Sequence, residues 1–435
     1  MTEAVHAGRT RRPLVGVLAA MAVSLTGTRV SAIALPWFVL VTTGSATRAG
    51  LVAFCEMTPY VLAKTFSGPL VDRTGPRLIS WTADLASATA ASAIPLLHAF
   101  DLLSFPPLLA LVALIGAARG PGDLAKEIMI PDAAEAGRTP LERAIALSGV
   151  TDRLAVTVGP AAGGALVALF GPLTGLALTA GCFALGALLV TLVLPRDMGR
   201  APRRTPASAA DKEPGYWRSF GQGLAFLRGE RLLLSVIVMV GITNLLDAGF
   251  TAVLVPVWAR SLGHGAGAVG LVLSVSGTAA IGGSLIAAAL AHRMRRRAVV
   301  LGGALCAGAP KFLILAASAP MWAVVAVFAA SGFGAGFLNP ILGALFFERV
   351  PRAMLGRVNA IGDSLAWAGI PFGGLVAGAA AAVAGLVPTL LVAAAVYFLT
   401  TGLTGLRPEW REMDRTRGQR APDHLIGPEP HPDER

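Results

Sequence analysis

The stretch Gly68-Pro69-Leu70-Val71-Asp72-Arg73-Thr74-Gly75-Pro76-Arg77 is a short polar interruption between two long apolar runs. A related stretch, Leu290-Ala291-His292-Arg293-Met294-Arg295-Arg296-Arg297, follows at an offset of 220 residues, counted from Leu70 to Leu290. The two stretches share their leucine, their first arginine and their last arginine. Similar segments at a fixed offset are typical of internal repeats. The pattern therefore predicts a chain made of two related halves.

The composition around these stretches is that of a membrane protein. The 435 residues are 54% hydrophobic and only 14% charged, and the mean hydropathy is +0.67. Soluble domains carry about 25% charged residues, so this chain lacks the polar surface that a soluble protein of its length needs. Nearly continuous apolar runs such as Leu390–Leu399 also exclude the alternating pattern of a membrane β-barrel. We predict an all-α integral membrane protein.

Apolar runs and their breaks predict twelve transmembrane helices, six on each side of one long polar stretch. The predicted spans are residues 14–41, 49–68, 78–98, 104–128, 147–170, 173–195, 232–258, 267–291, 298–317, 320–346, 358–383 and 386–406. The predicted parts are an N-terminal six-helix bundle over 1–195, a cytoplasmic linker over 196–231, a C-terminal six-helix bundle over 232–407 and a disordered cytoplasmic tail over 408–435.

The second part of the linker predicts a short amphipathic helix that lies on the membrane surface. Apolar residues recur there at helical spacing, with two arginines off the apolar stripe. These residues are Trp217, Phe220, Leu224 and Leu227, and Arg218 and Arg228.

Two further pairs of segments support the repeat. Leu141-Glu142-Arg143 resembles Leu355-Gly356-Arg357 at an offset of 214 residues (355 − 141), before the fifth helix of each half. Within that fifth helix, the segments 160–164 and 371–374 each combine a proline with two adjacent glycines. Repeated helix bundles are typical of transporters whose site lies between the halves, near the middle of the membrane.

The distribution of lysine and arginine predicts the orientation. With a cytoplasmic N-terminus, 28 of the 36 basic residues fall in inner segments, and only Arg48 and Arg260 fall in outer loops. Inner loops of membrane proteins are enriched in basic residues, so both chain ends are predicted to be cytoplasmic. The same distribution accounts for the net charge of +11 without any binding of nucleic acid.

The stretch 68–77 resembles the signature of the loop between helices two and three in the major facilitator superfamily, G-x-L-x-D-R-x-G-x-R, and is complete here. The resemblance implies twelve helices in two pseudo-symmetric bundles that alternate access. It also implies a cytoplasmic latch in which the aspartate meets a helix N-terminus of the other half, where an anion is favourable. The latch residues are Gly68, Asp72, Arg73, Gly75 and Arg77.

Helix five carries Gly159-Pro160-Ala161-Ala162-Gly163-Gly164, which resembles the antiporter motif of the drug exporters in that superfamily. The first glycine of the motif is replaced by Ala155, so the match is incomplete. Its glycines permit close helix approach; the alternative is general packing of small residues. The C-terminal half resembles the branch of macrolide-efflux proteins and the enterobactin exporter, through Pro371-Phe372-Gly373-Gly374 and neighbouring segments.

Charged residues within the predicted spans are candidates for function, because a charge at the bilayer centre costs at least about 2.5–3.5 kcal/mol. Glu56, Asp247 and Arg29 are the proton-coupling candidates. Burial in an apolar wall disfavours the charged form of a carboxyl group, and we expect Glu56 to pair with Arg29 on the neighbouring helix. The alternatives are a fixed structural ion pair for Glu56 and an asparagine or backbone partner for Asp247. Lys311 is interpreted as structural.

In the superfamily, helices one, four, seven and ten usually line the central cavity. That resemblance implies five substrate-cavity candidates: Arg29, Arg119, Asn244, Asp247 and Asn339. Four further charged residues near the cytoplasmic face are expected to serve the inner gate, namely Asp84, Asp152, Arg153 and Asp363.

Motifs for nucleotide binding and for membrane-bound hydrolases are absent from the sequence. We therefore expect no enzyme activity, no cofactor and no metal. The favoured hypothesis is a proton-coupled exporter of a lipophilic or amphipathic small molecule, monomeric, in the inner (plasma) membrane. Its expected partners are the substrate, protons and lipid, with no nucleic acid. The alternatives are an importer or facilitator of a metabolite with the same fold, and a transport-inactive membrane receptor.

Overall fold

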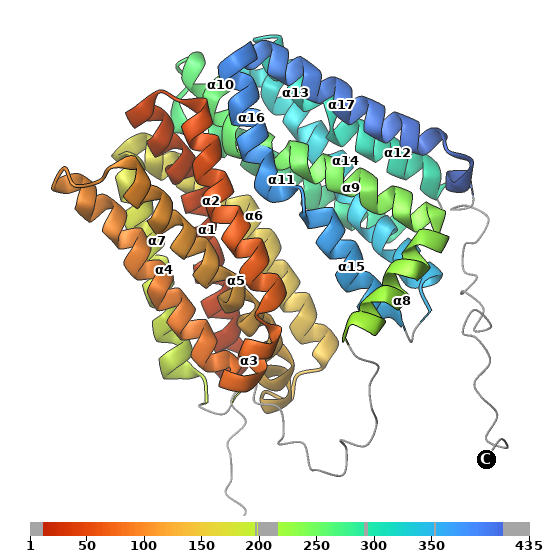
Figure 1. Ribbon diagram of the computed structural model, residues 1–435, viewed down its shortest axis with the longest axis horizontal. Helices are drawn as coiled ribbons and strands as arrows, with labels where there is room; N and C mark the ends of the chain where they lie inside the picture. The colour runs from red at the N-terminus through yellow and green to blue at the C-terminus, as the bar shows by residue number, and fades with distance from the viewer. Residues whose placement is uncertain (1–11, 196–197, 199–215, 291–294, 352–353, 412–435) are drawn as a thin grey trace, which may run out of the picture.

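The computed structural model describes residues 12–195, 198, 216–290, 295–351 and 354–411 (Figure 1). All regular structure in this part of the chain is helical, which confirms the predicted all-α class. The first seven helices are α1 (Arg12–Thr43), α2 (Ala46–Phe66), α3 (Gly68–Thr74), α4 (Pro76–Ala99), α5 (Phe105–Ala136), α6 (Leu141–Phe170) and α7 (Pro172–Val193).

Helix α8 (Tyr216–Gly229) begins the second part of the chain. The elements that follow it are α9 (Arg231–Gly249), the π-helix η2 (Phe250–Leu254), α10 (Val255–Ser261), α11 (Gly265–Leu290), α12 (Arg296–Ala307), α13 (Ala309–Ala316), α14 (Met321–Arg349), α15 (Leu355–Trp367), α16 (Ile370–Ala384), α17 (Leu386–Leu406) and the 3-10 helix η5 (Pro408–Arg411).

Ten helical segments of the described chain are long and apolar enough to cross a membrane. Helices α2 and α4 correspond to two predicted spans but are not among the ten. Helix α2 contains the charged residues Glu56 and Lys64, and α4 contains Asp84. These side chains lower the mean hydropathy of the two helices. The protein is a multi-pass membrane protein, and the polar character of α2 and α4 marks the region where its charged side chains gather.

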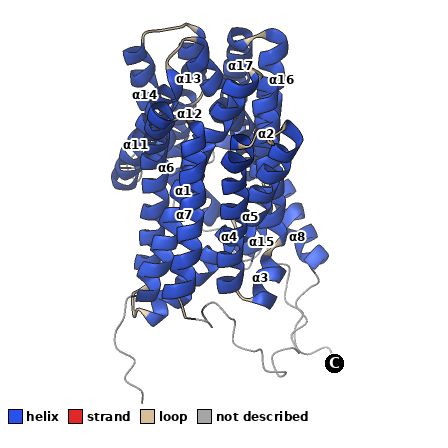
Figure 2. Ribbon diagram, turned by 90° about the vertical axis from the view of Figure 1, so that its left-hand side faces the viewer, coloured by secondary structure: helices blue, strands red, loops and turns tan. Residues whose placement is uncertain are grey.

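The helices form two groups that lie side by side (Figure 1): α1–α7, the N-terminal half, and α9–α17, the C-terminal half. The halves contact each other mainly where α6 meets α11 and where α2 meets α16. Both views place α3 and α8 at the same end of the molecule (Figure 2). Turns with positive φ separate several neighbouring helices, and glycine occupies most of them, for example Gly75 (φ 94°) and Gly171 (φ 84°), because it adopts that conformation without strain.

One predicted boundary needs correction. The tail was predicted to begin at residue 408, but η5 (Pro408–Arg411) folds back, and Trp410 is fully buried with its indole N–H donating to Ser235 Oγ at 3.0 Å. The predicted amphipathic helix is present as α8, and its Leu227 is buried in the core of the C-terminal half. Residues 412–435 and most of 196–215 lie outside the described residues.

Candidate functional site

The centre of the N-terminal half contains an ion pair between Glu56 of α2 and Arg119 of α5. The guanidinium Nη1 donates to Glu56 Oε1 at 2.8 Å, and the two side chains are only 13% and 6% exposed. The guanidinium also lies over the Tyr60 ring, 5.0 Å from its centroid. A methyl group at Gly116 would overlap the backbone of Glu56, so glycine at this position allows α5 to approach α2 closely enough for the pair to form.

Arg29 does not take the role that the sequence predicts. The expected partner of Glu56 was Arg29, but the structure gives that place to Arg119. Arg29 Nε is buried without a hydrogen-bond partner in the described part of the chain, and Gly159 of α6 packs directly against the side chain of Arg29. The residue interacts electrostatically with Arg119, a like charge, and with Asp152, an opposite one. Arg29 therefore lies in the same electrostatic environment as the pair without belonging to it.

A second, more exposed ion pair lies about two helical turns further along α2. Lys64 Nζ is 3.0 Å from Glu127 Oε1 of α5, and it lies 5.8 Å from the centroid of the Trp367 ring in α15. Lys64 thus connects the N-terminal half with the C-terminal half. Asp152, Arg153 and Asp363, which were expected to serve the inner gate, are exposed in the structure.

Asp84 differs from those expected gate residues because it is deeply buried. Its Oδ1 lies 2.8 Å from Lys126 Nζ, and Ser24 Oγ donates to its Oδ2 at 3.3 Å. Both charged side chains are 3–4% exposed. A methyl group at Gly186 would come 2.9 Å from Asp84 Oδ2, so α7 closes the pocket around the pair. Sequence reasoning missed the partner, Lys126, although a lysine and an aspartate that both lie within apolar spans already suggest a pair.

Asp247 pairs with Lys311, at the centre of the C-terminal half. The two atoms Asp247 Oδ1 and Lys311 Nζ are 2.6 Å apart, and three aromatic rings surround the ammonium group at 5.2–5.6 Å: Phe250, Phe312 and Tyr397. Cation–π contacts of this kind stabilise a poorly solvated cation. The prediction of a structural lysine with a neighbouring partner agrees with this contact.

The two asparagine candidates have different surroundings. Asn244 Nδ2 donates to the carbonyl oxygen of Ala366 at 3.0 Å, near the break between α15 and α16. Asn339 of α14 is exposed. The structure therefore brings Glu56 together with Arg119, and Asp247 together with Lys311, while the asparagines join neither pair.

The segment 68–77 forms α3 and the start of α4. Arg77 ties it to the end of α7: its Nε donates to Leu194 O at 3.0 Å and its Nη2 to Thr191 O at 2.7 Å. Asp72 is exposed, and its side chain has no hydrogen bond or ion pair within the described residues. Among the other latch candidates, Arg73 is exposed, Gly68 has open space around it and Gly75 makes the turn into α4.

The small residues of helix five, here α6, serve two contacts. Gly159 and Gly163 face α1, where a methyl group at Gly163 would come 3.0 Å from Val30 Cα. Gly164 faces the other half, where a methyl group would come 2.6 Å from Gly270 Cα in α11, and the Pro160 carbonyl lies against the same glycine. The motif therefore joins α6 both to its own half and to its neighbour.

The repeated segment 371–374 makes the equivalent contact on the other side of the molecule. A methyl group at Gly374 of α16 would come 3.4 Å from the Gly50 carbonyl oxygen of α2, and one at Gly50 would overlap the backbone of Gly374. Gly50 and Gly270 are separated by 220 residues (270 − 50), the offset of the sequence repeat. Two related glycine contacts thus hold the halves together.

No group of three or more possible metal ligands occurs among the described residues. Charged side chains within the helices are instead held in ion pairs, Glu56 with Arg119, Asp84 with Lys126 and Asp247 with Lys311.

Comparisons with known proteins find a matching family model and several relatives. A family model described as transmembrane secretion effector matches residues 14–431. The chain is 30% identical to the multidrug efflux pump Tap of Mycobacterium tuberculosis over 409 residues, which cover 93% of this chain and 95% of that protein. It is 29% identical to the multidrug efflux pump Tap of Mycolicibacterium fortuitum over 410 residues, covering 93% and 98%.

Solved structures with the same fold include transporters of other kinds. A mutant of the nucleoside transporter NupG has a TM-score of 0.71 at 13% identity, with 93% of this chain and all of that chain covered. A bacterial homologue of the human lysosomal transporter Spinster, in an inward-facing and unoccupied conformation, has a TM-score of 0.64 at 14% identity, with 95% and 100% covered. At these identities the likeness extends to the fold alone.

Proposed function

The chain belongs to the transmembrane secretion effectors of the major facilitator superfamily, and on that premise we propose that it exports a lipophilic or amphipathic small molecule in exchange for protons. Members of this superfamily are transporters and not enzymes. The proposal of export follows from the likeness to the efflux pumps named Tap. Among the structural observations, the buried Glu56–Arg119 pair carries the proposal of proton coupling.

We propose twelve spans, with α2 and α4 added to the ten apolar segments, in two bundles of six. The N-terminal bundle is residues 1–195 and the C-terminal bundle 232–407, joined by the linker 196–231. The protein acts as a monomer in the plasma membrane with both ends in the cytoplasm. The predominance of basic residues in inner segments supports this orientation, which makes the end with α3 and α8 cytoplasmic (Figure 2).

The halves rock about the two glycine contacts to expose the site alternately to each side. Gly164 meets Gly270, and Gly50 meets Gly374, in the half of the membrane that is extracellular under this orientation. Asp72, at the cytoplasmic end, makes no hydrogen bond or ion pair in the described part of the chain. This combination is expected of an inward-open state, in which the outer contacts are closed and the inner latch is released.

Protonation of Glu56 would remove the charge that attracts Arg119. The freed guanidinium would then lie close to the like charge of Arg29, with which it interacts electrostatically. A ligand that shifts an equilibrium between two conformations supplies a coupling free energy of about 1–3 kcal/mol, or about 5–150-fold in population. Proton binding at Glu56 would act in this way, because the pair lies between α2 and α5 and α2 also contacts the other half.

Transport in everted membrane vesicles tests the proposal. In such vesicles the cytoplasmic face is outside, so an exporter accumulates its substrate inside when the interior is acidified. The probes are two fluorescent amphipathic dyes, ethidium and rhodamine, and membranes without the protein are the control. We expect dye accumulation that depends on the protein and stops when the pH gradient is collapsed. Accumulation without a pH gradient would contradict proton coupling, and accumulation only in right-side-out vesicles would indicate an importer.

A further inference from the structure

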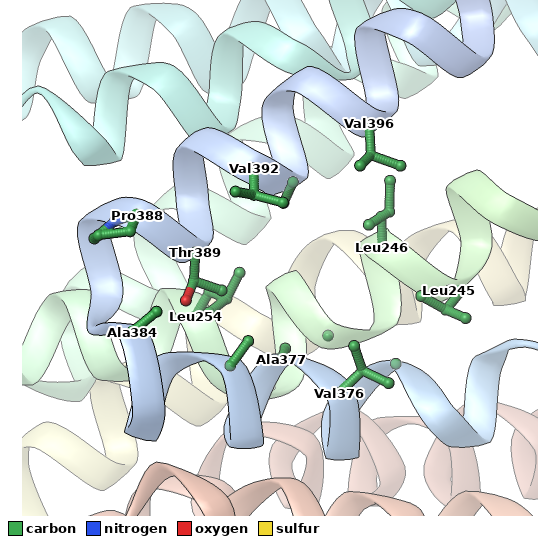
Figure 3. Close-up of a pocket in the computed structure, with 14 residues that line it drawn as sticks. Leu245, Leu246, Leu254, Val376, Ala377, Ala384, Pro388, Thr389, Val392 and Val396 are labelled. Carbon is green, nitrogen blue, oxygen red and sulfur yellow. The ribbon is translucent and has the colours of Figure 1, made fainter.

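A narrow apolar cavity of about 270 Å³ lies within the C-terminal half, between α9 with η2, α16 and α17 (Figure 3). Leu246, Val376 and Val392 project into it from these three sides. The charged residues described above do not line it. It is therefore separate from the ion pairs that the proposed export mechanism uses.

The chemistry of the cavity excludes a charged or strongly polar ligand. Its lining is aliphatic apart from Thr389, which is the one hydroxyl among the lining residues. That hydroxyl donates to the Gly385 carbonyl oxygen at 2.7 Å, so it is already satisfied. Burial of a polar group without a hydrogen-bond partner is costly, and a ligand here must bind through apolar contact alone.

The shape of the cavity suits a linear chain. It follows α17 from Pro388, near the turn between α16 and α17, to Val396, which is about 12 Å at the rise of an α-helix. Along this length its mouth is open beside Val376 and Val392, which are 53% and 63% exposed. In a membrane-spanning chain, exposed aliphatic side chains on α16 and α17 face the hydrocarbon of the bilayer. An elongated apolar cavity that opens to hydrocarbon offers favourable contact to an acyl chain.

The cavity lies against α16, the helix that packs on α2 of the other half. One face of α16 packs on α2 through Gly374 and Gly378, and Gly378 is so close that a methyl group there would come 2.5 Å from Ala46 O. Ala377 and Ala380, on the other side of the same helix, line the cavity. Any occupant of the cavity therefore supports the helix that holds the two halves together.

We propose that this cavity is a binding site for one acyl chain of a bilayer phospholipid, from the leaflet on the side of the Gly385 turn. The chain fills the space behind α16 and presses that helix toward α2. The site does not depend on the direction or the coupling of transport, so its test is independent of the test of the proposed function.

Native mass spectrometry of the purified full-length protein tests the site. The detergent-solubilised protein is incubated with dioleoylphosphatidylcholine, and the retained lipids are counted. Ala380→Leu places a larger side chain in the cavity, and Ala384→Leu does so nearer the turn. Ala379→Leu adds the same volume at an exposed neighbouring position outside the lining and is the matched control. We expect the wild type and Ala379→Leu to retain one lipid more per chain than either cavity variant.

A second measurement uses the same four proteins, in case one cavity variant folds poorly. Added lipid should raise the thermal unfolding temperature of the wild type and of Ala379→Leu, and it should raise that of a folded cavity variant less. Equal lipid counts and equal lipid-dependent shifts in all four proteins would overturn the proposal. Displacement of the wild-type lipid by rhodamine at equimolar concentration would also overturn it, because the cavity would then be a site for dyes.

Discussion

The two halves of the molecule contain related sequence segments, yet their helices differ in continuity. Each span of the N-terminal half is one uninterrupted helix, although all but α7 contain an internal proline. Three spans of the described C-terminal half are interrupted: by the π-helix η2, by Gly308 between α12 and α13, and at Ala368–Gly369 between α15 and α16. Proline by itself therefore does not decide where these spans break.

The two halves also differ in how deeply their ion pairs are buried. The N-terminal half holds two ion pairs with little exposure, Glu56–Arg119 and Asp84–Lys126. The C-terminal half holds Asp247–Lys311, in which the aspartate is 37% exposed, and beside α9 it contains the apolar cavity. We interpret the N-terminal half as a rigid body with an internal charge switch and the C-terminal half as the more deformable partner. Three sets of variants sharpen this contrast.

The largest expected effect is on stability. Lys126→Ala leaves the Asp84 carboxylate buried without its partner, and breaking a buried pair in this way costs about 3–5 kcal/mol. Lys311→Ala should cost less, because the more exposed Asp247 can be solvated. Thermal unfolding of the purified proteins measures both. The double variant Asp84→Leu, Lys126→Met should recover most of the loss, because it leaves no unpaired charge. An equal or smaller loss for Lys126→Ala than for Lys311→Ala would refute the contrast.

A smaller effect is expected at the contact between α6 and α11. Gly270→Val places side-chain atoms against Gly164 and the Pro160 carbonyl, which a rigid N-terminal half cannot move away. We expect dye transport to fall roughly tenfold. A destabilisation of about 1.4 kcal/mol of the conformation with the outer contact closed lowers the population of that conformation by this factor. Gly267→Val is the matched control, since a methyl group there meets only Ala168 Cβ at an ordinary 3.5 Å. Equal transport by the two variants would show that the close contact is not needed.

The smallest effect is expected at Asp72. Asp72→Asn removes a charge and almost no volume, and an anion at a helix N-terminus contributes about 0.3–1 kcal/mol. Transport should therefore fall about two- to five-fold, while the amount of protein in the membrane, measured by immunoblot, stays the same. Asp101→Asn, the same change at an exposed turn between α4 and α5, is the control, because asparagine readily adopts the positive φ of that turn. Wild-type transport by Asp72→Asn would mean that the segment 68–77 acts here only as a turn.

The fold could be predicted from sequence because long apolar runs, repeated segments and the distribution of arginine act over many residues. Single interactions within the bundles could not. Glu56 was assigned to Arg29 on the neighbouring helix, but the partner is decided by side-chain direction and by the close approach of α5 at Gly116. Periodicity alone contains neither quantity.

The breaks in the C-terminal half were also missed. The span 358–383 was predicted as one helix, although Gly369 followed by Pro371 is a signal for a helix end; in the structure α15 ends at Trp367 and α16 begins at Ile370. Likewise, Trp410 was assigned to the tail by its charged neighbours, but its burial against Ser235 depends on tertiary contact. Local composition is a poor guide where one aromatic side chain decides the fold of its segment.

The charge switch assigned to the N-terminal half is tested most directly by uphill and downhill dye transport in vesicles containing purified protein, at several pH values. Glu56→Gln imitates the protonated carboxyl and keeps its size, and Asp247→Asn is the matched change in the other half. The account predicts that Glu56→Gln abolishes accumulation driven by a pH gradient but retains downhill exchange, whereas Asp247→Asn retains both. Accumulation by Glu56→Gln with the pH profile of the wild type, together with its loss in Asp247→Asn, would contradict the account and place the proton site in the C-terminal half.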